Sequence, residues 1–580
     1  MDTGNFPDAF KWSLLETVTA TTPLDEALDG IAIHSDNWQA LNLLREKYRE
    51  RVKCIYIDPP YNTGGDGFAY KDSYQSASWL AMMEDRLRLG AHTLQACGVL
   101  FSSIDQNEYP RLRTLLERTL GCGNALGTIV WKNVTDNNPT NIAVEHEYVE
   151  CFAKHRGMLE SEWKNPYSDA KDLLVELGRE LLDRHGDTPR LHNAYQEWLR
   201  ANKVFLGPLE GYKFIDGGGI YAGSRSVHNP GKEGYRYDVI HPETGKPCKQ
   251  PLMGYRFPEE TLQRLLAQDR ILFGEDERKL IELKVYAHEY EAKLPSVIEI
   301  DGRSGANDLT NLFGEAQRFK NPKAPALLQE LIPYAAGAGD LILDYFAGSG
   351  TTAHAVMRIN RKAGIGLRWL AVEASHNLEA MIVPRVKKVA FAVDWLKGRP
   401  LGDEGPGAFV RVQSFEQYAD SLENLDTEPM AGDTADLPFE DAALALRYRL
   451  DRTSHGLYCG IERFGSPFGY QLRRADGSGE GNACEVDLVE SLAYLLGLDL
   501  ERLYREPLGV VLLGRSRRGQ TVGVFFRECA DPGSADWVAA KLAQHPTDRV
   551  YTNDPAALTF PGGERLEAIE AAFALQFGRS

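Results

Sequence analysis

The stretch "LILDYFAGSGTT", from Leu341 to Thr352, decides the fold. Its first four residues are typical of a buried strand that ends at Asp344, and the periodicity of a helix begins at Thr351. Between them, Gly348 and Gly350 allow backbone to approach a ligand closely, and the start of the helix offers unpaired N–H groups. Alone, this turn is equally typical of a strand-to-helix connection that binds nothing.

An acidic residue follows one strand later. Glu373 ends "LRWLAVE", where a carboxylate is placed to bind ribose hydroxyls. The segment "GSGTTA" supplies two glycines, so the full GxGxxG pattern of dinucleotide sites is absent. A ligand that combines ribose, adenine and an amino-acid carboxylate fits, and S-adenosylmethionine is such a ligand.

A second loop carries different chemistry. In "CIYIDPPYNTG", Cys54 to Gly64, a predicted strand ends in a carboxylate, two prolines and a tyrosine. If this strand lies beside residues 341–344, both loops meet at the carboxyl edge of a parallel sheet, where ligands bind. "DPPY" alone is as typical of a turn that ends a strand, but the two motifs together are far more specific than either.

The residues of the second loop suit methyl transfer to an exocyclic amine of a base. The Asp58 carboxylate and the Pro59 carbonyl, which the Pro59-Pro60 turn fixes, would accept the two N–H bonds of the amine. Tyr61 would stack on a base flipped out of the duplex, and its ring would attract a methyl-sulfonium cation. This chemistry needs no metal ion.

The rest of the chain predicts an α/β doubly wound (Rossmann-like) sheet with an insertion, because strands and helices alternate on both sides of residues 156–314. A segment without Lys or Arg, residues 414–441, indicates an acidic linker. The predicted divisions are an N-terminal extension (1–29), the catalytic half of the sheet domain (30–155), an inserted target-recognition region (156–314), the cofactor-binding half (315–400), a linker (401–441) and a separate α+β module (442–580).

Composition bounds the class of protein. The chain has 580 residues and a formal charge of −18. Residues 401–580 carry 17 Lys and Arg against 29 Asp and Glu, so most of the acidic excess lies outside the predicted sheet. The eight cysteines are scattered without a CxxC pair, which argues against a zinc finger and a disulfide framework. With no apolar run of membrane length and no secretory signal, we expect a cytoplasmic protein.

The inserted region has the composition of a DNA-contacting surface. Residues 203–256 carry 8 Lys and Arg against 5 Asp and Glu, interleaved with tyrosines. The alternative is an ordinary loop-rich insertion with packed tyrosines. Candidate DNA contacts are Lys213, Arg225, Lys232, Arg236, Lys249 and Arg256, with His146 outside the insertion as a minor candidate. "GRSRRGQT", residues 514–521, lacks the lysine of a phosphate-binding loop, so a basic hairpin tip is expected there.

These motifs resemble the β-class amino DNA methyltransferases, in which a DPPY loop precedes an FxGxG loop. Here Asp58-Pro59-Pro60-Tyr61 precedes Phe346-Ala347-Gly348-Ser349-Gly350, and "HSDNWQALNLL", "FKNPKAPALLQELI" and "VPRVKKV" are also similar to family segments. The resemblance covers roughly residues 30–155 and 315–392. It implies catalysis by Asp58, Pro59, Pro60 and Tyr61. It implies cofactor contacts by Asp36, Asn37, Lys323, Asp344, Phe346, Ala347, Gly348, Ser349, Gly350, Thr351 and Glu373. The family's Lys-Pro is Lys323-Ala324 here.

The nearest subgroup looks like the modification subunits of type III restriction–modification systems. It implies double-stranded DNA as substrate, dimerisation and a helicase–nuclease partner, while related chains also act alone or in other phage-defence systems. The aspartate of the catalytic loop favours adenine. The alternatives are methylation of the cytosine 4-amino group or of RNA, and a specificity subunit that mainly binds DNA for its partner.

Overall fold

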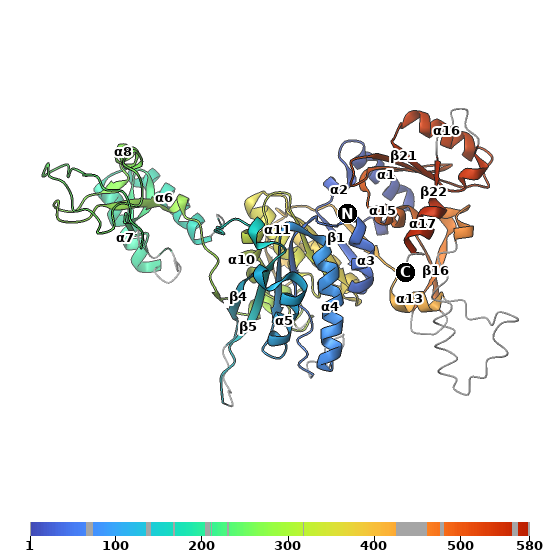
Figure 1. Ribbon diagram of the computed structural model, residues 1–580, viewed down its shortest axis with the longest axis horizontal. Coiled ribbons are helices and arrows are strands. Elements are labelled where there is room, and N and C mark those ends of the chain that lie inside the picture. Colours follow the sequence, from blue (N-terminus) through green and yellow to red (C-terminus); the bar gives the residue numbers. More distant parts are fainter. Residues whose placement is uncertain are drawn as a thin grey trace. The chain divides into compact units, whose positions relative to one another are not determined.

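The computed structural model describes residues 2–64, 74–134, 141–165, 169–202, 209, 211–228, 231–316, 318–424, 461–475, 481–558 and 566–577. Two compact units make up the chain (Figure 1). The main unit comprises Met1–Glu160 and Pro295–Ser580, and the second unit comprises Ser161–Leu294.

Nine strands of the described residues form the sheet of the main unit, in the order β10-β4-β5-β3-β2-β11-β12-β1-β15. The strands are β1 (Gly30–His34), β2 (Val52–Ile57), β3 (Leu94–Ile104), β4 (Ala125–Lys132), β5 (His146–Ala153), β10 (Val297–Glu299), β11 (Leu341–Asp344), β12 (Arg368–Glu373) and β15 (Val410–Ser414). Neighbours run parallel except around β5, which is antiparallel to both β3 and β4. The predicted α/β doubly wound sheet is therefore confirmed, with one reversed strand.

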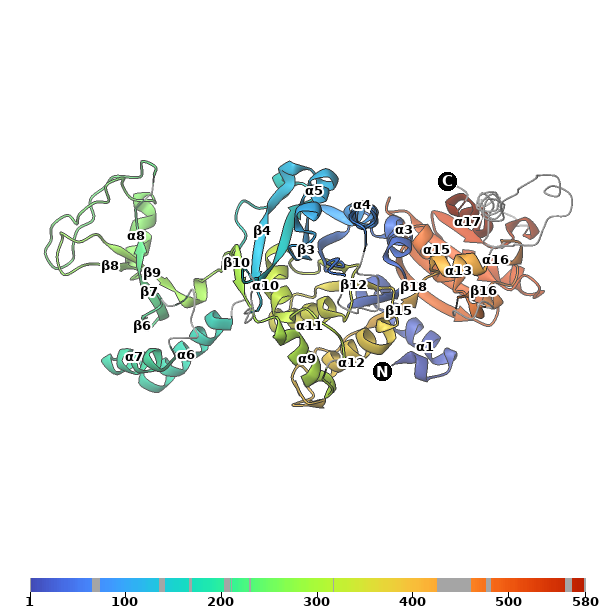
Figure 2. The ribbon, with the colours of Figure 1, turned by 90° about the horizontal axis from the view of Figure 1, so that it is seen from below.

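Helices cover both faces of this sheet. On one face α3 (Asn37–Lys47), α4 (Ser76–Thr93) and α5 (Tyr109–Leu120) pack in a row, and on the other α10 (Pro325–Ala335), α11 (Thr351–Ala363) and α12 (Val383–Phe391) do so (Figure 2). Every residue of β1 and β11 is buried as a result. Because both faces of these strands are buried, their sequences are continuous apolar runs in which apolar and polar residues do not alternate.

The C-terminal part of the main unit forms a second sheet, β18-β19-β20-β21-β22. Its described elements are β16 (Gln471–Arg474), β17 (Asn482–Glu485), α15 (Leu488–Leu495), β18 (Asp499–Glu506), β19 (Gly509–Arg515), β20 (Thr521–Arg527), α16 (Ser534–Gln544), β21 (Arg549–Thr552), β22 (Leu566–Ala568) and α17 (Ile569–Phe577). Strands β19 and β20 pair antiparallel across the "GRSRRGQT" turn, so the predicted hairpin tip is confirmed.

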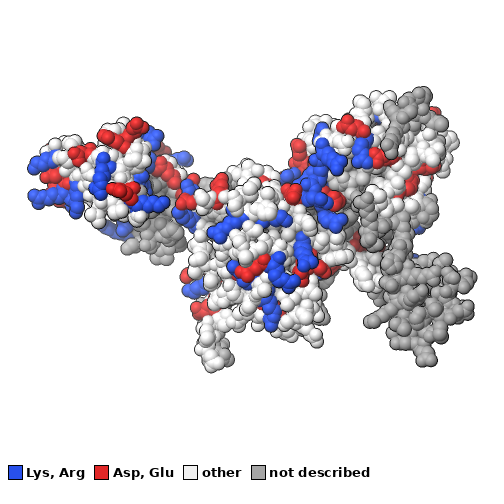
Figure 3. Space-filling view, viewed as in Figure 1, with Lys and Arg blue, Asp and Glu red and all other residues white. Residues whose placement is uncertain are grey.

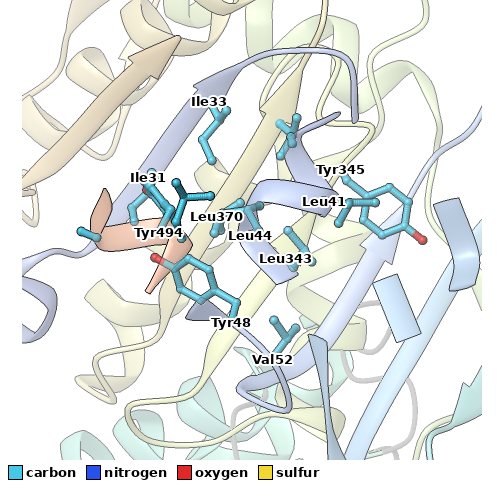
Figure 4. Close-up of a cluster of buried hydrophobic side chains, with 14 of the residues drawn as sticks. Ile31, Ile33, Leu41, Leu44, Tyr48, Val52, Leu343, Tyr345, Leu370 and Tyr494 are labelled. Carbon is cyan, nitrogen blue, oxygen red and sulfur yellow. The ribbon is translucent and has the colours of Figure 1, made fainter. Parts of the chain in front are cut away.

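One apolar core joins this C-terminal part to the main sheet. Leu492 and Tyr494 of α15 belong to the same buried cluster as Leu41 and Leu44 of α3 and Leu370 of β12. In Figure 4, Tyr494 lies among side chains that come from the strands and from α3. The prediction of a separate module at 442–580 is therefore wrong for its described residues, because the apolar faces of α3 and α15 bury each other.

Three predicted boundaries also shift. The compact inserted unit is Ser161–Leu294, narrower than 156–314, because β10 pairs with β4 and α9 (Arg303–Phe313) lies in the main unit. The predicted linker 401–441 contains β15, which pairs with β1, and then α13 (Tyr418–Glu423); its residues 425–441 lie outside the described residues. Residues 1–29 include α1 (Asp8–Thr19) and α2 (Leu24–Ala27), which pack against β18.

The second unit has its own sheet and cores. Strands β6 (Phe214–Asp216), β7 (Gly219–Ser226), β9 (Glu282–Tyr286) and β8 (Ile271–Leu272) pair antiparallel in that order, with α6 (Asp169–His185), α7 (Pro189–Asn202) and α8 (Glu259–Ala267). Leu174, Leu191 and Tyr195 belong to one of its buried clusters. Within the described part of either unit, we find no helix with the length and apolarity needed to cross a membrane.

Candidate active site

The two loops singled out in the sequence lie side by side. Strands β2 and β11 are parallel neighbours at the centre of the sheet, with Leu343 opposite Ile55. Asp58 leaves the carboxyl end of β2, and the glycine-rich turn leaves the carboxyl end of β11. This is the edge of a parallel sheet at which ligands bind, so the predicted meeting of the two loops is confirmed.

The loop after β2 is held in place by its neighbours. Pro59 and Pro60 are buried, and the Pro60 carbonyl accepts a 2.9 Å hydrogen bond from the indole N–H of Trp79, which is fully buried in α4. Asn62 has φ of 61°, and its amide donates a 2.7 Å bond to the buried carboxylate of Glu108. These contacts fix the direction in which Asp58 and Tyr61 leave the strand.

Four polar side chains converge beside this loop. The Lys323 ammonium lies 3.0 Å from Asp58 Oδ1 and 3.2 Å from Glu147 Oε2. The Tyr61 hydroxyl donates a 2.7 Å hydrogen bond to the same Glu147 oxygen, and Asn133 Nδ2 donates a 2.7 Å bond to the other. The Lys323 Nζ also lies 4.6 Å from the centre of the Tyr61 ring. We call Asp58, Tyr61, Glu147 and Lys323 the catalytic cluster.

The charges of this cluster depend on one another. Burial raises the pKa of Asp58, and the ammonium of Lys323 opposes that rise. Burial alone would lower the pKa of Lys323, but the carboxylates of Asp58 and Glu147 outweigh it, so the net shift is upward. Lys323 is therefore a fixed cation that favours the ionised form of Asp58.

The loop after β11 has the backbone that its glycines predict. Gly348 and Gly350 have φ of 54° and 79°, and a Cβ at Gly350 would lie 3.2 Å from the Ile382 side chain. The N–H of Ala347 donates to the Val372 carbonyl at 3.1 Å, which ties the loop to β12. Phe346 and Gly348 are the partly exposed residues of the loop, so Gly348 offers backbone without a side chain shortly before α11, a favourable place for an anionic or polar ligand.

The buried side chain of Asp344 stabilises the conformation of this loop. Its side chain accepts hydrogen bonds from the Phe346 N–H at 2.9 Å and from the Thr352 hydroxyl at 2.5 Å, and the residue is only 2% exposed. Burial raises the pKa of Asp344 to about 7. A direct contact between Asp344 and a ligand stays a prediction, since both of its oxygens already have partners.

Ser349 and Thr351 are likewise turned inward. Their hydroxyls accept hydrogen bonds of 2.9 and 3.1 Å from the guanidinium of Arg385, which is fully buried beneath the loop. The Thr351 hydroxyl also lies 3.3 Å from the Lys323 carbonyl, to which it donates. Arg385, which the sequence did not single out, therefore holds the loop and links it to the segment that carries Lys323.

Two acidic residues border the same edge. Glu373, at the end of β12, accepts hydrogen bonds from the Gly348 N–H at 2.8 Å and from Ser375. Asp36 caps the N-terminus of α3, accepts a hydrogen bond from the Trp38 N–H at 2.8 Å, and faces Arg86 at 3.2 Å. Asn37 is buried and donates a 2.8 Å bond to the Tyr345 carbonyl. These residues surround the glycine loop with carboxylates suited to the hydroxyls and amine of a nucleoside.

Residues 52–383, more than half of the chain, match the protein-family model described as DNA methylase. The chain belongs to this DNA methylase family. It is 46% identical over 374 residues to the EcoP15I Mod subunit, a type III restriction–modification protein of Escherichia coli, covering 59% of this chain and 58% of that one. It is 29% identical over 370 residues to the StyLTI Mod subunit of Salmonella typhimurium, covering 58% and 51%. The chain spans between half and three-fifths of the length of these relatives.

Among solved structures, the M1.HpyAVI–SAM complex aligns with 62% of this chain and 98% of that chain, at 12% identity and a TM-score of 0.29.

One predicted residue lies apart from the catalytic cluster. The ring nitrogen Nε2 of His146 is 2.9 Å from the Tyr148 hydroxyl, and the Tyr148 ring stacks on Tyr109. Its neighbour Glu147 belongs to the cluster instead, because adjacent side chains of β5 point to opposite faces. His146 therefore packs against Tyr148 of the same strand, and its role in DNA binding stays a prediction.

The remaining candidates for DNA contacts belong to the second unit of the chain. Lys213, Lys232, Arg236, Lys249 and Arg256 are exposed, and the side chain of Arg225 lies outside the described residues. Lys and Arg side chains spread over this unit among Asp and Glu (Figure 3). Arg236 donates a 2.9 Å bond to the Leu252 carbonyl, which holds it beside one exposed loop.

Proposed function

We propose that the chain transfers a methyl group from S-adenosylmethionine to the N6 amine of adenine in duplex DNA, as the modification subunit of a restriction–modification system. The observation that carries this proposal is the adjacency of the Asp58–Tyr61 loop and the glycine-rich loop at the centre of the sheet. One loop suits an exocyclic amine and the other suits the cofactor.

The residues around the glycine loop fit that cofactor. The partly exposed backbone of Gly348, which carries no side chain, suits its methionine part, and the carboxylates of Glu373 and Asp36 suit its ribose and adenine. Bound there, S-adenosylmethionine supplies an electrophilic methyl group on a cationic sulfur.

The chain's own residues prepare the amine. The Asp58 carboxylate and the Pro59 carbonyl accept its N–H bonds, which leaves the nitrogen lone pair free to attack the methyl group. Tyr61, fixed by its bond to Glu147, stacks on the flipped base. When the C–N bond forms and the sulfur keeps the electron pair, the nitrogen becomes positive and its proton passes to Asp58.

The choice of adenine and of the system rests on two supports. An aspartate opens the catalytic loop, as in the adenine-specific proteins that the chain resembles. The relatives reported above are Mod subunits of type III enzymes. We propose on that basis a second, helicase–nuclease subunit as partner, association of two copies of this chain, and double-stranded DNA held by the exposed lysines and arginines of the second unit.

The test is transfer of a labelled methyl group to unmethylated duplex DNA, followed by nucleoside analysis. We expect N6-methyladenine from the wild type and from Asp403→Ala, a variant that removes an exposed carboxylate. We expect none from Asp58→Ala that still binds the cofactor. 4-Methylcytosine, or transfer to RNA alone, would overturn the choice of substrate, and a native rate for Asp58→Ala would overturn the mechanism.

A further inference from the structure

Strand β15 brings the C-terminal part of the chain to the cofactor edge of the sheet. It runs parallel to β1, with Ser414 opposite His34, and the Phe415 N–H donates a 2.9 Å bond to the His34 carbonyl. Residues after Ser414 therefore begin at the edge where Asp36 and Glu373 lie.

Two short elements form one body at this edge, and we call α13 together with β16 the C-terminal strap. The Asn424 side chain donates a 2.7 Å bond to the Arg473 carbonyl and accepts a 2.8 Å bond from the Arg473 N–H. The buried carboxylate of Asp420 accepts bonds from the N–H groups of Gln417 at 2.8 Å and Ala475 at 2.9 Å. The Gln417 bond caps α13 itself, and the other three bonds fix the position of Arg474 relative to α13.

Arg474 is the first contact between the strap and the cofactor edge. Its Nη2 lies 3.0 Å from Nδ1 of His34, a residue only 9% exposed. The other ring nitrogen, Nε2, lies 3.1 Å from the carbonyl of Ala374, directly after Glu373. A carbonyl only accepts, so Nε2 carries the proton and Nδ1 accepts from Arg474. Arg474 thus fixes the tautomer and orientation of the imidazole that holds the turn after Glu373.

Glu379 is the competing partner of His34. Its Oε1 lies 3.1 Å from the same Nδ1, but a carboxylate bonds that nitrogen only when the ring is protonated there. Arg474 and Glu379 therefore meet at the same ring nitrogen, and the bond of Nε2 to the Ala374 carbonyl is compatible with Arg474 as the donor to Nδ1.

The backbone of α13 makes the second contact. With the Gln39 amide oriented so that its nitrogen faces Asp36, it donates a 3.0 Å bond to Asp36 Oδ1 and accepts a 3.1 Å bond from the Tyr418 N–H. The strap thus reaches the Asp36 carboxylate through Gln39, and it reaches the backbone directly after Glu373 through His34.

We propose that the C-terminal strap is the outer wall of the cofactor site, with Arg474 as a positioning residue that sets the affinity for S-adenosylmethionine through His34. The inference rests on the proposed function and deepens it, since it makes cofactor binding a property of both halves of the main unit. The strap touches neither Asp58 nor Tyr61 in any contact of the described residues, so it acts on binding and not on the transfer step.

The experiment compares full-length Arg474→Ala, Arg474→Lys and Arg473→Ala, with cofactor binding followed by calorimetry and turnover by methyl transfer. Arg473 is the matched control, because it is the exposed neighbour of Arg474 on the same strand. We expect Arg474→Ala to raise the dissociation constant and the KM for S-adenosylmethionine about tenfold, the loss of one charged hydrogen bond. We expect kcat at saturating cofactor to stay within about twofold, with partial rescue by Arg474→Lys.

A double-variant cycle tests the route through His34. If Arg474 acts through that ring, adding Arg474→Ala to His34→Ala weakens binding no further. Wild-type affinity in Arg474→Ala, or an equal loss in Arg473→Ala, would overturn the inference and leave the proposed function intact. Failure of the wild-type chain to bind S-adenosylmethionine would overturn the proposed function, and the inference with it.

Discussion

Lys323 has two carboxylates within ion-pair distance, and only Asp58 belongs to the loop that we place at the target amine. Removing one partner from a buried ionic cluster leaves an uncompensated charge, which is costly. Burial already raises the pKa of Asp58 against the opposing effect of Lys323. Without the ammonium, that pKa rises further, and Asp58 and Glu147 repel each other.

The variant Lys323→Met tests this role. In the proposed mechanism the ionised form of Asp58 accepts the amine N–H, so activity is lost as the pH falls through the pKa of Asp58. The acid limb of the pH–rate profile of Lys323→Met should therefore move to higher pH. At pH 7 we expect kcat to fall at least about tenfold, the loss of a charged hydrogen bond. Steady-state rates from pH 5 to 9 check this. Lys397→Met, at an exposed position, should keep the native profile; an unmoved acid limb in Lys323→Met would contradict the role.

The sequence predicts the contiguous part of the catalytic cluster but not Glu147. The carboxylate, prolines and aromatic ring of Asp58 to Tyr61 are contiguous, so their chemistry is readable from the sequence. Glu147 lies 86 residues from Tyr61 along the chain, and it meets the loop only because β5 packs against β3. Because successive side chains of a strand point to opposite faces of the sheet, either His146 or Glu147 faces Asp58 and Tyr61. A single sequence does not identify which of the two does so.

Among the elements, the turn from β11 into α11 depends on glycine for two separable reasons. Gly350 has φ of 79°, and a Cβ there would lie 3.2 Å from Ile382. Gly366, before β12, has φ of 64° with nothing within 4 Å of a Cβ. A substitution at Gly366 therefore reports only the cost of a left-handed backbone. A substitution at Gly350 reports that cost together with the effect of a methyl group against Ile382.

Both Gly350→Ala and Gly366→Ala should lower the free energy of unfolding by about 1–2 kcal/mol, the cost of the left-handed region for a residue with Cβ. Only Gly350→Ala should also weaken S-adenosylmethionine binding, because it alone changes the loop at the cofactor edge. Chemical denaturation and calorimetric titration measure the two effects. Equal cofactor affinity in both variants would show that the β11–α11 turn does not contribute to cofactor binding.

Elements with long apolar runs were predictable, and the short amphipathic strand β15 was not. Val410 and Val412 alternate with polar residues in β15, and Val412 is 50% exposed, as expected of a strand at the edge of a sheet. An acidic segment without Lys or Arg follows directly, so its composition suggested a linker. This stretch belongs to the sheet because β15 pairs with β1. That pairing is a long-range contact, which the local sequence pattern does not indicate.

At the scale of the whole molecule, the buried clusters divide the chain into units other than those that the composition predicted. Leu492 is fully buried in the cluster that contains the strands of the main sheet, although it lies in the C-terminal part. Leu191 is 1% exposed in a cluster built only from residues of the second unit. The chain should therefore melt in two steps, in which the C-terminal part unfolds with the sheet.

Calorimetry of Leu492→Ala and Leu191→Ala tests this division, since each variant opens a cavity in one core and costs about 2–5 kcal/mol. In the proposed function S-adenosylmethionine binds only the folded main unit, so it should raise the temperature of one transition. We expect Leu492→Ala to lower that transition alone and Leu191→Ala to lower the other. A transition that Leu492→Ala lowers and S-adenosylmethionine leaves unmoved would show that the C-terminal part folds on its own. The strap would then not be bound to the cofactor edge by a shared core.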